Sequence, residues 1–359
     1  MYDYLIVGSG FFGSICAYEL NKRGKSVYVI DKRDHIGGNV YTEEKHGIHV
    51  HKYGPHIFHT DSKKVWDWIN QFCTFTNFSF QPVATLNDKM YSLPFNMWTM
   101  NQVYGITSPE TLDNIGLGNG NDKKYESVED FAISKVGREV YEILIKGYTT
   151  KQWGRDPSKL PASIIKRLPI RKTYDNRYFN DKYQGIPIGG YTQIFEKLLK
   201  GIDVFKPFDY LEDLDLLPEY NEVIYTGPID EFYHCEHGKL EYRSLKWEEE
   251  VLDIDNYQGT AMMNYLDVKV PYTRIIEHKH FDYKKSNKTI ISKEYPQSKG
   301  EEYYPICDKK NMDMYKKYKN MPKIDRLQKK VHFGGRLAEY KYYDMHQVIG
   351  SALSFIRKL

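Results

Sequence analysis

Residues 2–13 read YDYLIVGSGFFG, an apolar run that ends in the pattern Gly-x-Gly-x-x-Gly. Residues 4–7 are short and apolar, which predicts a buried parallel strand. Residues 11–23 carry apolar side chains at helical spacing, and SVYVID at 26–31 predicts the next strand. The order strand, glycine turn, helix, strand is typical of a β-α-β unit that binds a dinucleotide.

The glycines and the acid that follows have separate tasks in such a unit. Gly8 permits the tight turn, Gly10 lets backbone approach a pyrophosphate, and Gly13 lets the helix pack closely on the strand. The helix N-terminus offers N–H groups and a partial positive charge to the phosphates. Asp31 ends the second strand, where a carboxylate can bind the ribose hydroxyls of adenosine.

Two further segments favour FAD over NAD. Residues 32–40, KRDHIGGNV, complete the spacing D-x-x-x-x-x-G-G, which resembles the FAD fingerprint of glutathione-reductase-type proteins; a plain Gly-Gly turn is the alternative. Residues 330–359 predict a strand, a Gly-Gly turn, a loop and a closing helix from about Asp344. The N-terminus of that helix would stabilise negative charge on a reduced flavin. We therefore expect both chain ends to enclose one FAD.

The composition favours a soluble, nearly neutral protein of two or three domains. The 359 residues carry a formal charge of +3 with 28% charged residues, which points to neither nucleic acid nor a membrane surface. No apolar run reaches the ~20 residues of a spanning helix, and the start lacks the basic lead of a signal peptide. The four cysteines are widely separated, as in reduced proteins. We expect a cytoplasmic location.

The middle of the chain interrupts the nucleotide-binding fold. Residues 83–93 alternate around Asn87-Asp88, which predicts a hairpin, and the pattern from 95 to about 168 is helical. Strand-like stretches recur at 186–190, 223–226, 239–245, 260–268, 272–278 and 289–295. We predict an α/β fold with a discontinuous Rossmann-like FAD-binding domain (1–80, 190–235 and 320–359), a helical domain (95–168) and an antiparallel β-sheet domain (81–94, 169–189 and 236–319).

Three stretches are more specific than a flavin fold. They are YGPHIFHT at 53–60, IKGYTTKQWGRDPSKLPASIIKRLPIR at 145–171, and YTRIIEHKHF at 272–281 together with the C-terminal GGRLAEYKYYDMH. With the N-terminal unit, they resemble the bacterial UDP-galactopyranose mutases nearly end to end. KGYTxKQWG and GRLAEYKYYDM are the most specific motifs of this resemblance.

The resemblance implies a redox-neutral isomerase. The family interconverts UDP-galactopyranose and UDP-galactofuranose, which supplies galactofuranose for cell-surface glycans, and its non-covalently bound FAD must be reduced. N5 of the flavin attacks the anomeric carbon and UDP leaves. The sugar ring opens as a flavin iminium, recloses on a different hydroxyl, and UDP reattaches. The cofactor is thus the nucleophile.

The resemblance also implies the site residues. Its catalytic residues are Arg167 on a mobile loop, its fixed partner Arg274, and His59; guanidinium groups suit a diphosphate. The further substrate-binding residues are Asn77, Tyr148, Trp153, Tyr178, Arg243, Asn264, Tyr304, Tyr342 and Asp344. The cofactor-binding residues are Gly8, Gly10, Phe11, Gly13, Asp31, Lys32, Gly38, Asn39, His56, Ile57, Arg336, Tyr343, Asp344 and Met345.

Several of these predicted site residues have a second interpretation. Trp153 and Tyr148 are expected to stack on uracil, although an aromatic pair in a helical domain is usually core. Arg171 competes with Arg167, because both lie on one short stretch. Asp344 either acts near the sugar or flavin or caps the last helix.

Neighbouring residues leave two further choices open. Tyr303 and Tyr343 are adjacent to the predicted Tyr304 and Tyr342, so each assignment can be off by one. His56 and His59 lack a visible third ligand, so no metal is predicted.

His278 and His280 alternate as on a strand. They are therefore expected to face opposite sides and to be structural.

A rival function is an FAD amine oxidase or desaturase with the same nucleotide fold, and another is a non-catalytic binding protein. No second Gly-x-Gly-x-x-Gly unit is present for a nicotinamide cofactor, so NAD(P)H as reductant would dock transiently. The sugar remains open between galactose and its 2-acetamido analogue, and we expect a homodimer.

Overall fold

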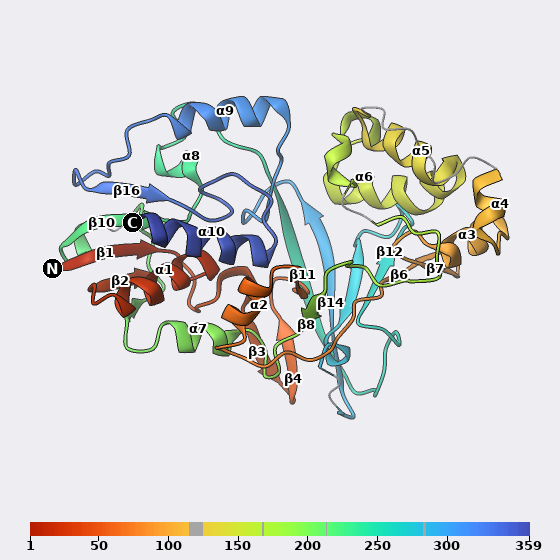
Figure 1. Cartoon of the computed structure of the whole chain (residues 1–359), viewed down its shortest axis with the longest axis horizontal. Coiled ribbons are helices and arrows are strands. Elements are labelled where there is room, and N and C mark those ends of the chain that lie inside the picture. Colours follow the sequence, from red (N-terminus) through yellow and green to blue (C-terminus); the bar gives the residue numbers. More distant parts are fainter. Residues whose placement is uncertain (115–124, 167–168, 213, 283–284) are drawn as a thin grey trace.

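The computed structural model describes residues 1–114, 125–166, 169–212, 214–282 and 285–359 (Figure 1). Two predictions therefore lie outside the described residues: the turn or loop that GLGNGND at 116–122 indicates, and the site role of Arg167. Within the described residues, no helix combines the length and the apolar character needed to cross a membrane.

One parallel sheet of five strands carries the nucleotide-binding pattern. Its order is β16-β10-β1-β2-β9, and every neighbouring pair is parallel. The strands are β1 (Tyr2–Val7), β2 (Val27–Ile30), β9 (Asp203–Phe205), β10 (Tyr220–Tyr225) and β16 (Lys330–Phe333). The predicted β-α-β unit is confirmed, and strands from distant parts of the chain complete its sheet.

Alternate residues of these strands face two different cores. Ile6, Val29 and Ile224 pack under the helices α1 (Phe11–Lys22), α7 (Thr192–Leu198) and α10 (Met345–Lys358). Their neighbours Leu5 and Ile30 face the opposite core, which includes Phe232 of α8 (Ile229–Phe232). The period of two along each strand therefore buries both faces, as in parallel sheets covered on both sides. Helices α1 and α10 lie side by side near both chain ends (Figure 1).

A second sheet has seven strands in the order β15-β11-β14-β13-β12-β6-β7. All of its pairs are antiparallel except β12 with β6, which is parallel. The strands are β6 (Val83–Leu86), β7 (Lys89–Ser92), β11 (Tyr242–Leu252), β12 (Met262–Tyr265), β13 (Arg274–Glu277), β14 (Thr289–Gln297) and β15 (Tyr304–Pro305). The hairpin β6–β7 turns at Asn87 and Asp88, whose φ angles of 50° and 58° match the predicted turn.

Helices gather at the end of the molecule far from both chain ends (Figure 1). They share a core that includes Met97, Val136, Tyr141 and Leu144. They are α3 (Met97–Tyr104), α4 (Pro109–Asn114), α5 (Val128–Val140), the π-helical turn η2 (Tyr141–Lys146) and α6 (Gly147–Trp153), followed by the short turns η3 (Pro157–Lys159) and η4 (Ala162–Ile164). Ser127 caps α5 by accepting the Asp130 N–H.

Smaller elements connect these parts. They are the strand pairs β3 (Thr42–Lys45) with β4 (Ile48–His51) and β5 (Phe58–Thr60) with β8 (Tyr183–Gly185), the helices α2 (Lys63–Ile69) and α9 (Lys309–Lys319), and the turns η1 (Gly38–Val40), η5 (Leu214–Leu216) and η6 (His278–His280). Ser62 caps α2 by accepting the backbone N–H of Val65.

Two local predictions are wrong. The predicted strand 186–190 is a turn-rich segment, and β8 lies immediately before it at 183–185. His278 and His280 lie in the turn η6 rather than on a strand, so they do not alternate between two faces. His278 is fully buried, and its Nε2 lies 2.8 Å from Ser292 Oγ. Its local sequence resembles a strand, but β13 ends at Glu277, whose carboxylate accepts the backbone N–H groups of Tyr257 and Gln258.

Candidate active site

The glycines of the first turn are required by close contacts. A Cβ on Gly13 would lie 1.9 Å from the carbonyl oxygen of Gly8, so only glycine lets α1 approach β1 this closely. Gly8 itself has a φ of +102°, and a Cβ there would lie 2.0 Å from Thr226 Oγ1. Gly10 precedes α1 without a side-chain cap, which leaves the first N–H groups of the helix available to a ligand.

Asp31 is held in place by three donors. Its Oδ2 accepts from Ser9 N at 2.7 Å and from Ser9 Oγ at 2.6 Å, and its Oδ1 accepts from Arg33 N at 2.9 Å. These bonds fix the carboxylate at the end of β2, where the sequence places a ribose ligand.

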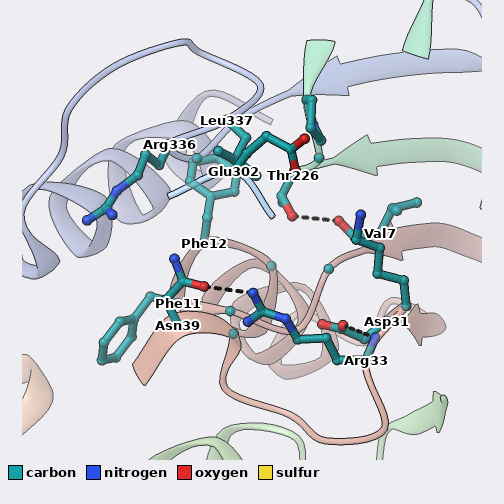
Figure 2. A pocket seen from close by; sticks show the side chains of 18 of the residues that line it. Val7, Phe11, Phe12, Asp31, Arg33, Asn39, Thr226, Glu302, Arg336 and Leu337 are labelled. Carbon is teal, nitrogen blue, oxygen red and sulfur yellow. Dashed lines mark hydrogen bonds between the residues drawn. The ribbon is translucent and has the colours of Figure 1, made fainter. Parts of the chain in front are cut away.

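A cavity of about 250 Å³ lies between these residues and the C-terminal segment. Figure 2 shows Asp31 and Arg33 on one side of it and Arg336 and Leu337 on the other. Of the predicted cofactor residues, the following line it: Gly8, Gly10, Phe11, Gly13, Asp31, Lys32, Gly38, Asn39, His56, Arg336 and Met345.

A second cavity, of about 310 Å³, lies between the seven-stranded sheet and the helices. Of the predicted site residues, the following line it: Ile57, His59, Tyr148, Trp153, Tyr178, Asn264, Arg274, Tyr304, Tyr342 and Asp344. His56, Arg336 and Met345 line both cavities. The two cavities are therefore adjacent, and these three residues form their shared lining.

Arg274 is a permanent positive charge of the second cavity, in addition to Arg336 at the junction. Its Nε and Nη2 donate to Glu294 Oε2 at 2.7 and 2.5 Å, and Nη1 lies 3.5 Å from the sulfur of Met262. Burial opposes the charge on Arg274, but the carboxylate of Glu294 outweighs burial and raises the arginine pKa above its ordinary value. Glu294 thus orients the guanidinium and keeps it charged, while Nη1 retains donor capacity for an anion.

Half-buried tyrosines lie near this arginine in the lining of the cavity. The rings of Tyr304 and Tyr342 stack with centroids 5.4 Å apart, and the guanidinium of Arg336 lies 5.7 Å from the Tyr342 centroid. Burial raises the pKa of both Tyr148 and Tyr304 above the ordinary tyrosine value. Their hydroxyls therefore remain neutral donors at physiological pH.

His56 at the junction is an uncharged histidine. Burial, followed by the positive charge of Arg336, lowers the pKa of His56 to about 4. Its Nδ1 lies 2.7 Å from the carbonyl oxygen of Gly54, which can only accept. The proton therefore sits on Nδ1, and Nε2 is left as an acceptor.

His59 is oriented by two neighbours that the sequence did not reveal. Its Nδ1 lies 3.0 Å from Asp181 Oδ2, and its ring stacks on Phe179 at a centroid distance of 3.7 Å. One ligand atom each from His59, Asp344 and His346 lies within 4.8 Å of the other two, so two possible metal ligands other than His56 lie beside His59. Asp344 also N-caps α10 in a capping box with Gln347, so both of its predicted roles are compatible.

Some predicted residues lie outside the second cavity's lining. Asn77 is exposed and does not line it. Arg243 is buried behind α6, where its Nε donates to the Gln152 carbonyl at 3.0 Å, so it supports the helix backbone. The hydroxyl of Tyr343 instead lies near Glu339 and Lys341, while its carbonyl accepts from Arg336 Nη2 at 2.6 Å.

The structure also distinguishes adjacent residues that the sequence left as alternatives. Tyr304 lines the second cavity, whereas Tyr303 is buried elsewhere. Arg171 is held in the segment 171–180 by the side chain of Asn180 and the carbonyls of Asp175 and Arg177, and it does not line either cavity.

Known proteins similar to this chain are nucleotide-sugar mutases. A match to the UDP-galactopyranose mutase family covers residues 143–342, and a match to NAD(P)-binding Rossmann-like domains covers residues 6–72. The chain is 41% identical to the Klebsiella pneumoniae protein named "Probable UDP-galactopyranose mutase", over 98% of this chain and 93% of that protein. It is 39% identical to a dTDP-fucopyranose mutase of Escherichia coli, over 98% of this chain and 97% of that protein.

Solved structures show that the fold is shared more widely. A reduced UDP-galactopyranose mutase superposes with a TM-score of 0.76 at 14% identity, covering 100% of this chain and 93% of that chain. Putrescine oxidase bound to putrescine superposes with a TM-score of 0.62 at 12% identity, covering 99% and 98%. A mutase and an oxidase thus share this architecture, so the architecture alone does not choose between isomerisation and oxidation.

Proposed function

This chain belongs to the UDP-galactopyranose mutase family, an isomerase family, and from that premise we propose that it interconverts UDP-galactopyranose and UDP-galactofuranose without net oxidation. The observation that carries the proposal is the junction of two cavities at His56, Arg336 and Met345. A dinucleotide cofactor in the first cavity would meet a nucleotide sugar in the second at this junction.

We propose FAD as the cofactor of the first cavity. Asp31 would bind the adenosine ribose, the N–H groups at the start of α1 would bind the pyrophosphate, and the N-terminus of α10 would lie near the flavin. When bound and reduced, FAD supplies an electron-rich ring nitrogen for the anomeric carbon of the sugar. His56 lacks a positive charge at neutral pH, and its Nε2 can accept a hydrogen bond from a group at the junction.

In the second cavity, Arg274 and the tyrosines would hold the diphosphate. UDP must be bound both while attached to the sugar and after it leaves, so its charge must be neutralised throughout the reaction. The guanidinium of Arg274 remains charged, and the hydroxyls of Tyr148, Tyr304 and Tyr342 can donate to phosphate oxygens. Arg167 is assigned a second diphosphate contact from the family motif alone.

The uridine would lie near α6. Trp153 offers a face for stacking, as aromatic side chains do for single bases. Asn264 also lines this cavity, and among the described residues its buried Oδ1 has no hydrogen-bond partner. A ligand N–H, such as that of uracil, would satisfy this acceptor.

A dTDP-sugar is the rival substrate. Identities of 41% and 39% to a UDP-galactopyranose mutase and a dTDP-fucopyranose mutase are too close to select the nucleotide or the sugar. The test therefore includes both: the protein is reduced with dithionite, supplied with UDP-galactofuranose or with dTDP-fucofuranose, and assayed for the pyranose by chromatography.

We expect the reduced protein to convert UDP-galactofuranose while its flavin stays reduced, and the oxidised protein to be inactive. Preferential conversion of the dTDP-sugar would replace the proposed substrate. Oxygen consumption with an amine, without isomerisation, would instead support the amine-oxidase function.

We also propose a cytoplasmic homodimer whose flavin is reduced by transiently docking NAD(P)H. The location rests on the cysteine pattern, the reductant rests on the single Gly-x-Gly-x-x-Gly unit of the sequence, and the dimer is proposed to form through the helical domain. Light scattering during gel filtration and anaerobic bleaching of the flavin by NADH or NADPH would test the dimer and the reductant.

A further inference from the structure

One side of helix α6 (Gly147–Trp153) lines the second cavity, and another side meets a backbone loop whose Leu266 lines the same cavity. Tyr148, Thr149, Gln152 and Trp153 line the cavity. Gly147 and Lys151 are four residues apart, so they lie on one side of the helix. This side meets residues 265–272, the loop that joins β12 to β13.

The ammonium of Lys151 lies inside a cage of four backbone carbonyls. Its Nζ is 2.6 Å from the carbonyl oxygen of Tyr265, 2.9 Å from that of Asp267, 3.1 Å from that of Val270 and 2.9 Å from that of Tyr272. An ammonium has three N–H groups, so four oxygens share them. Within the described part of the chain, no carboxylate lies within ion-pair distance of Lys151. Burial lowers the pKa of Lys151 to about 8, and the carboxylate of Asp267 opposes this shift, so the ammonium stays charged at neutral pH.

Gly147 provides independent evidence that helix and loop are in close contact. A Cβ at this position would lie 2.6 Å from the carbonyl oxygen of Leu266. The backbone of α6 therefore rests against the loop without an intervening side chain, and Lys151 bonds the same loop one helical turn later.

This loop is continuous with residues on the far wall of the cavity. Asn264 lies in β12 just before it, and Arg274 begins β13 just after it. The end of the loop is held by Thr273, whose Oγ1 donates to Glu294 Oε1 at 2.6 Å. A displacement of the loop would therefore change the distance from Arg274 to Tyr148 and Trp153.

We propose that Lys151 is a positioning residue, a built-in cation that holds the loop 265–272 against α6 and so sets the separation of the two walls of the nucleotide-sugar cavity. The four carbonyls turn toward one point and repel one another unless a cation lies between them. Backbone carbonyls of this kind also coordinate small monovalent cations. With the lysine side chain removed, the cage accepts an ammonium ion.

The test compares Lys151→Ala with and without ammonium chloride. It rests on the proposed function, since UDP affinity and mutase turnover are the readouts. We expect normal flavin loading, UDP binding weakened by about tenfold or more, and kcat/KM lowered by up to about 10²-fold from misplacement of the cavity walls. Ammonium should restore much of both quantities, whereas tetramethylammonium at equal ionic strength, being too large for the cage, should not.

Two further variants keep the test decisive. Lys151→Met removes the charge but fills the path of the side chain, so it should lose UDP affinity and gain nothing from ammonium. It also serves if Lys151→Ala fails to fold. Lys146→Ala is the matched control, because Lys146 lies five residues earlier and pairs with Glu142 at the surface. It should behave as wild type in every buffer.

Wild-type UDP affinity in Lys151→Ala or in Lys151→Met would overturn the proposal. Failure of ammonium to restore the UDP affinity and turnover of Lys151→Ala would overturn it as well. UDP binding is measured by calorimetry without turnover. A wild-type protein that binds UDP but does not isomerise the sugar would therefore refute the proposed reaction and leave the role of Lys151 standing.

Discussion

At the scale of single residues, the pairing of Arg274 with Glu294 affects both the stability of the fold and the charge available for catalysis, and these two effects can be separated. Glu294 is fully buried and Arg274 nearly so, so removing one charge leaves the other without compensation. Such a loss costs about 3–5 kcal/mol of stability, independently of any role in catalysis. A variant of Arg274 alone therefore cannot distinguish a loss of stability from a loss of catalysis.

We predict that Arg274→Ala lowers kcat/KM by about 10²–10³-fold, since it removes a donor to charge that develops on the leaving diphosphate. It should also lower the denaturation midpoint. In the double variant Arg274→Ala/Glu294→Gln, stability should recover while activity does not. Arg177→Ala, which removes an exposed arginine paired with Asp175, is the control. Recovery of turnover in the double variant would mean that Arg274 has no role beyond balancing Glu294.

Trp153 is predicted to stack on the nucleotide base. Trp153→Ala should weaken UDP binding by about 1–3 kcal/mol, the usual cost of losing an aromatic partner of a base. Trp98→Ala is the matched control, because Trp98 lies on α3 with 49% of its surface exposed, contacts Tyr174 edge-on and lines neither cavity. Calorimetric titration with UDP gives the measurement, and equal affinities of the two variants would exclude the stacking role.

At the scale of elements, two helical glycines have opposite surroundings. Gly13 of α1 faces the carbonyl of Gly8, whereas a Cβ on Gly350 of α10 would meet no atom within 4 Å. The close approach of α1 to β1 depends on the first glycine, while the second only lowers helix propensity.

Gly13→Ala should therefore separate α1 from β1 and abolish flavin binding. Gly350→Ala should retain flavin and gain up to about 1 kcal/mol of stability, the difference in helix propensity between the two residues. The flavin absorbance of the purified variants and their urea midpoints test both expectations. Full flavin loading in Gly13→Ala would show that the glycine turn still binds the cofactor when α1 moves away from β1.

At the scale of the whole molecule, buried histidines should make the fold sensitive to acid. Burial lowers the pKa of His278 to about 3 and that of His56 to about 4, and it lowers the pKa of His51 as well. In the unfolded chain these groups titrate near pH 6.5. Between pH 6.5 and about 4 the unfolded state thus binds more protons, and stability falls as the pH falls.

The expected loss is on the order of 3 kcal/mol for each histidine whose pKa is lowered by two or three pH units. His278→Asn, which keeps an acceptor for the backbone N–H of His51, should flatten the fall in the free energy of unfolding between pH 6.5 and 4. Urea titrations at several pH values measure this slope. An unchanged slope in the variant would assign the acid sensitivity to other groups.

Much of the fold could be predicted from local pattern. The β-α-β unit, the Asn87-Asp88 hairpin and the capped helix α10 were all expected, because periodicity, turn residues and caps act within about a dozen residues. The segment 186–190 and the His278–His280 turn were missed. Their local composition resembles strands, and the pairing of neighbouring strands ends before them.

The sequence by itself determined the dinucleotide-binding turn and the kinds of residue in the site, since glycine, arginine and tyrosine carry their chemistry wherever they lie. Only the tertiary structure decided which of them meet. Strand register places Arg274 opposite Glu294 and Tyr304 opposite Arg243, and a slip of one residue would have turned Tyr303 into the cavity instead. The carbonyls around Lys151 lie 114 to 121 residues away in the chain. No local pattern encodes such a cage, because it arises from the packing of a helix against a loop from a distant segment.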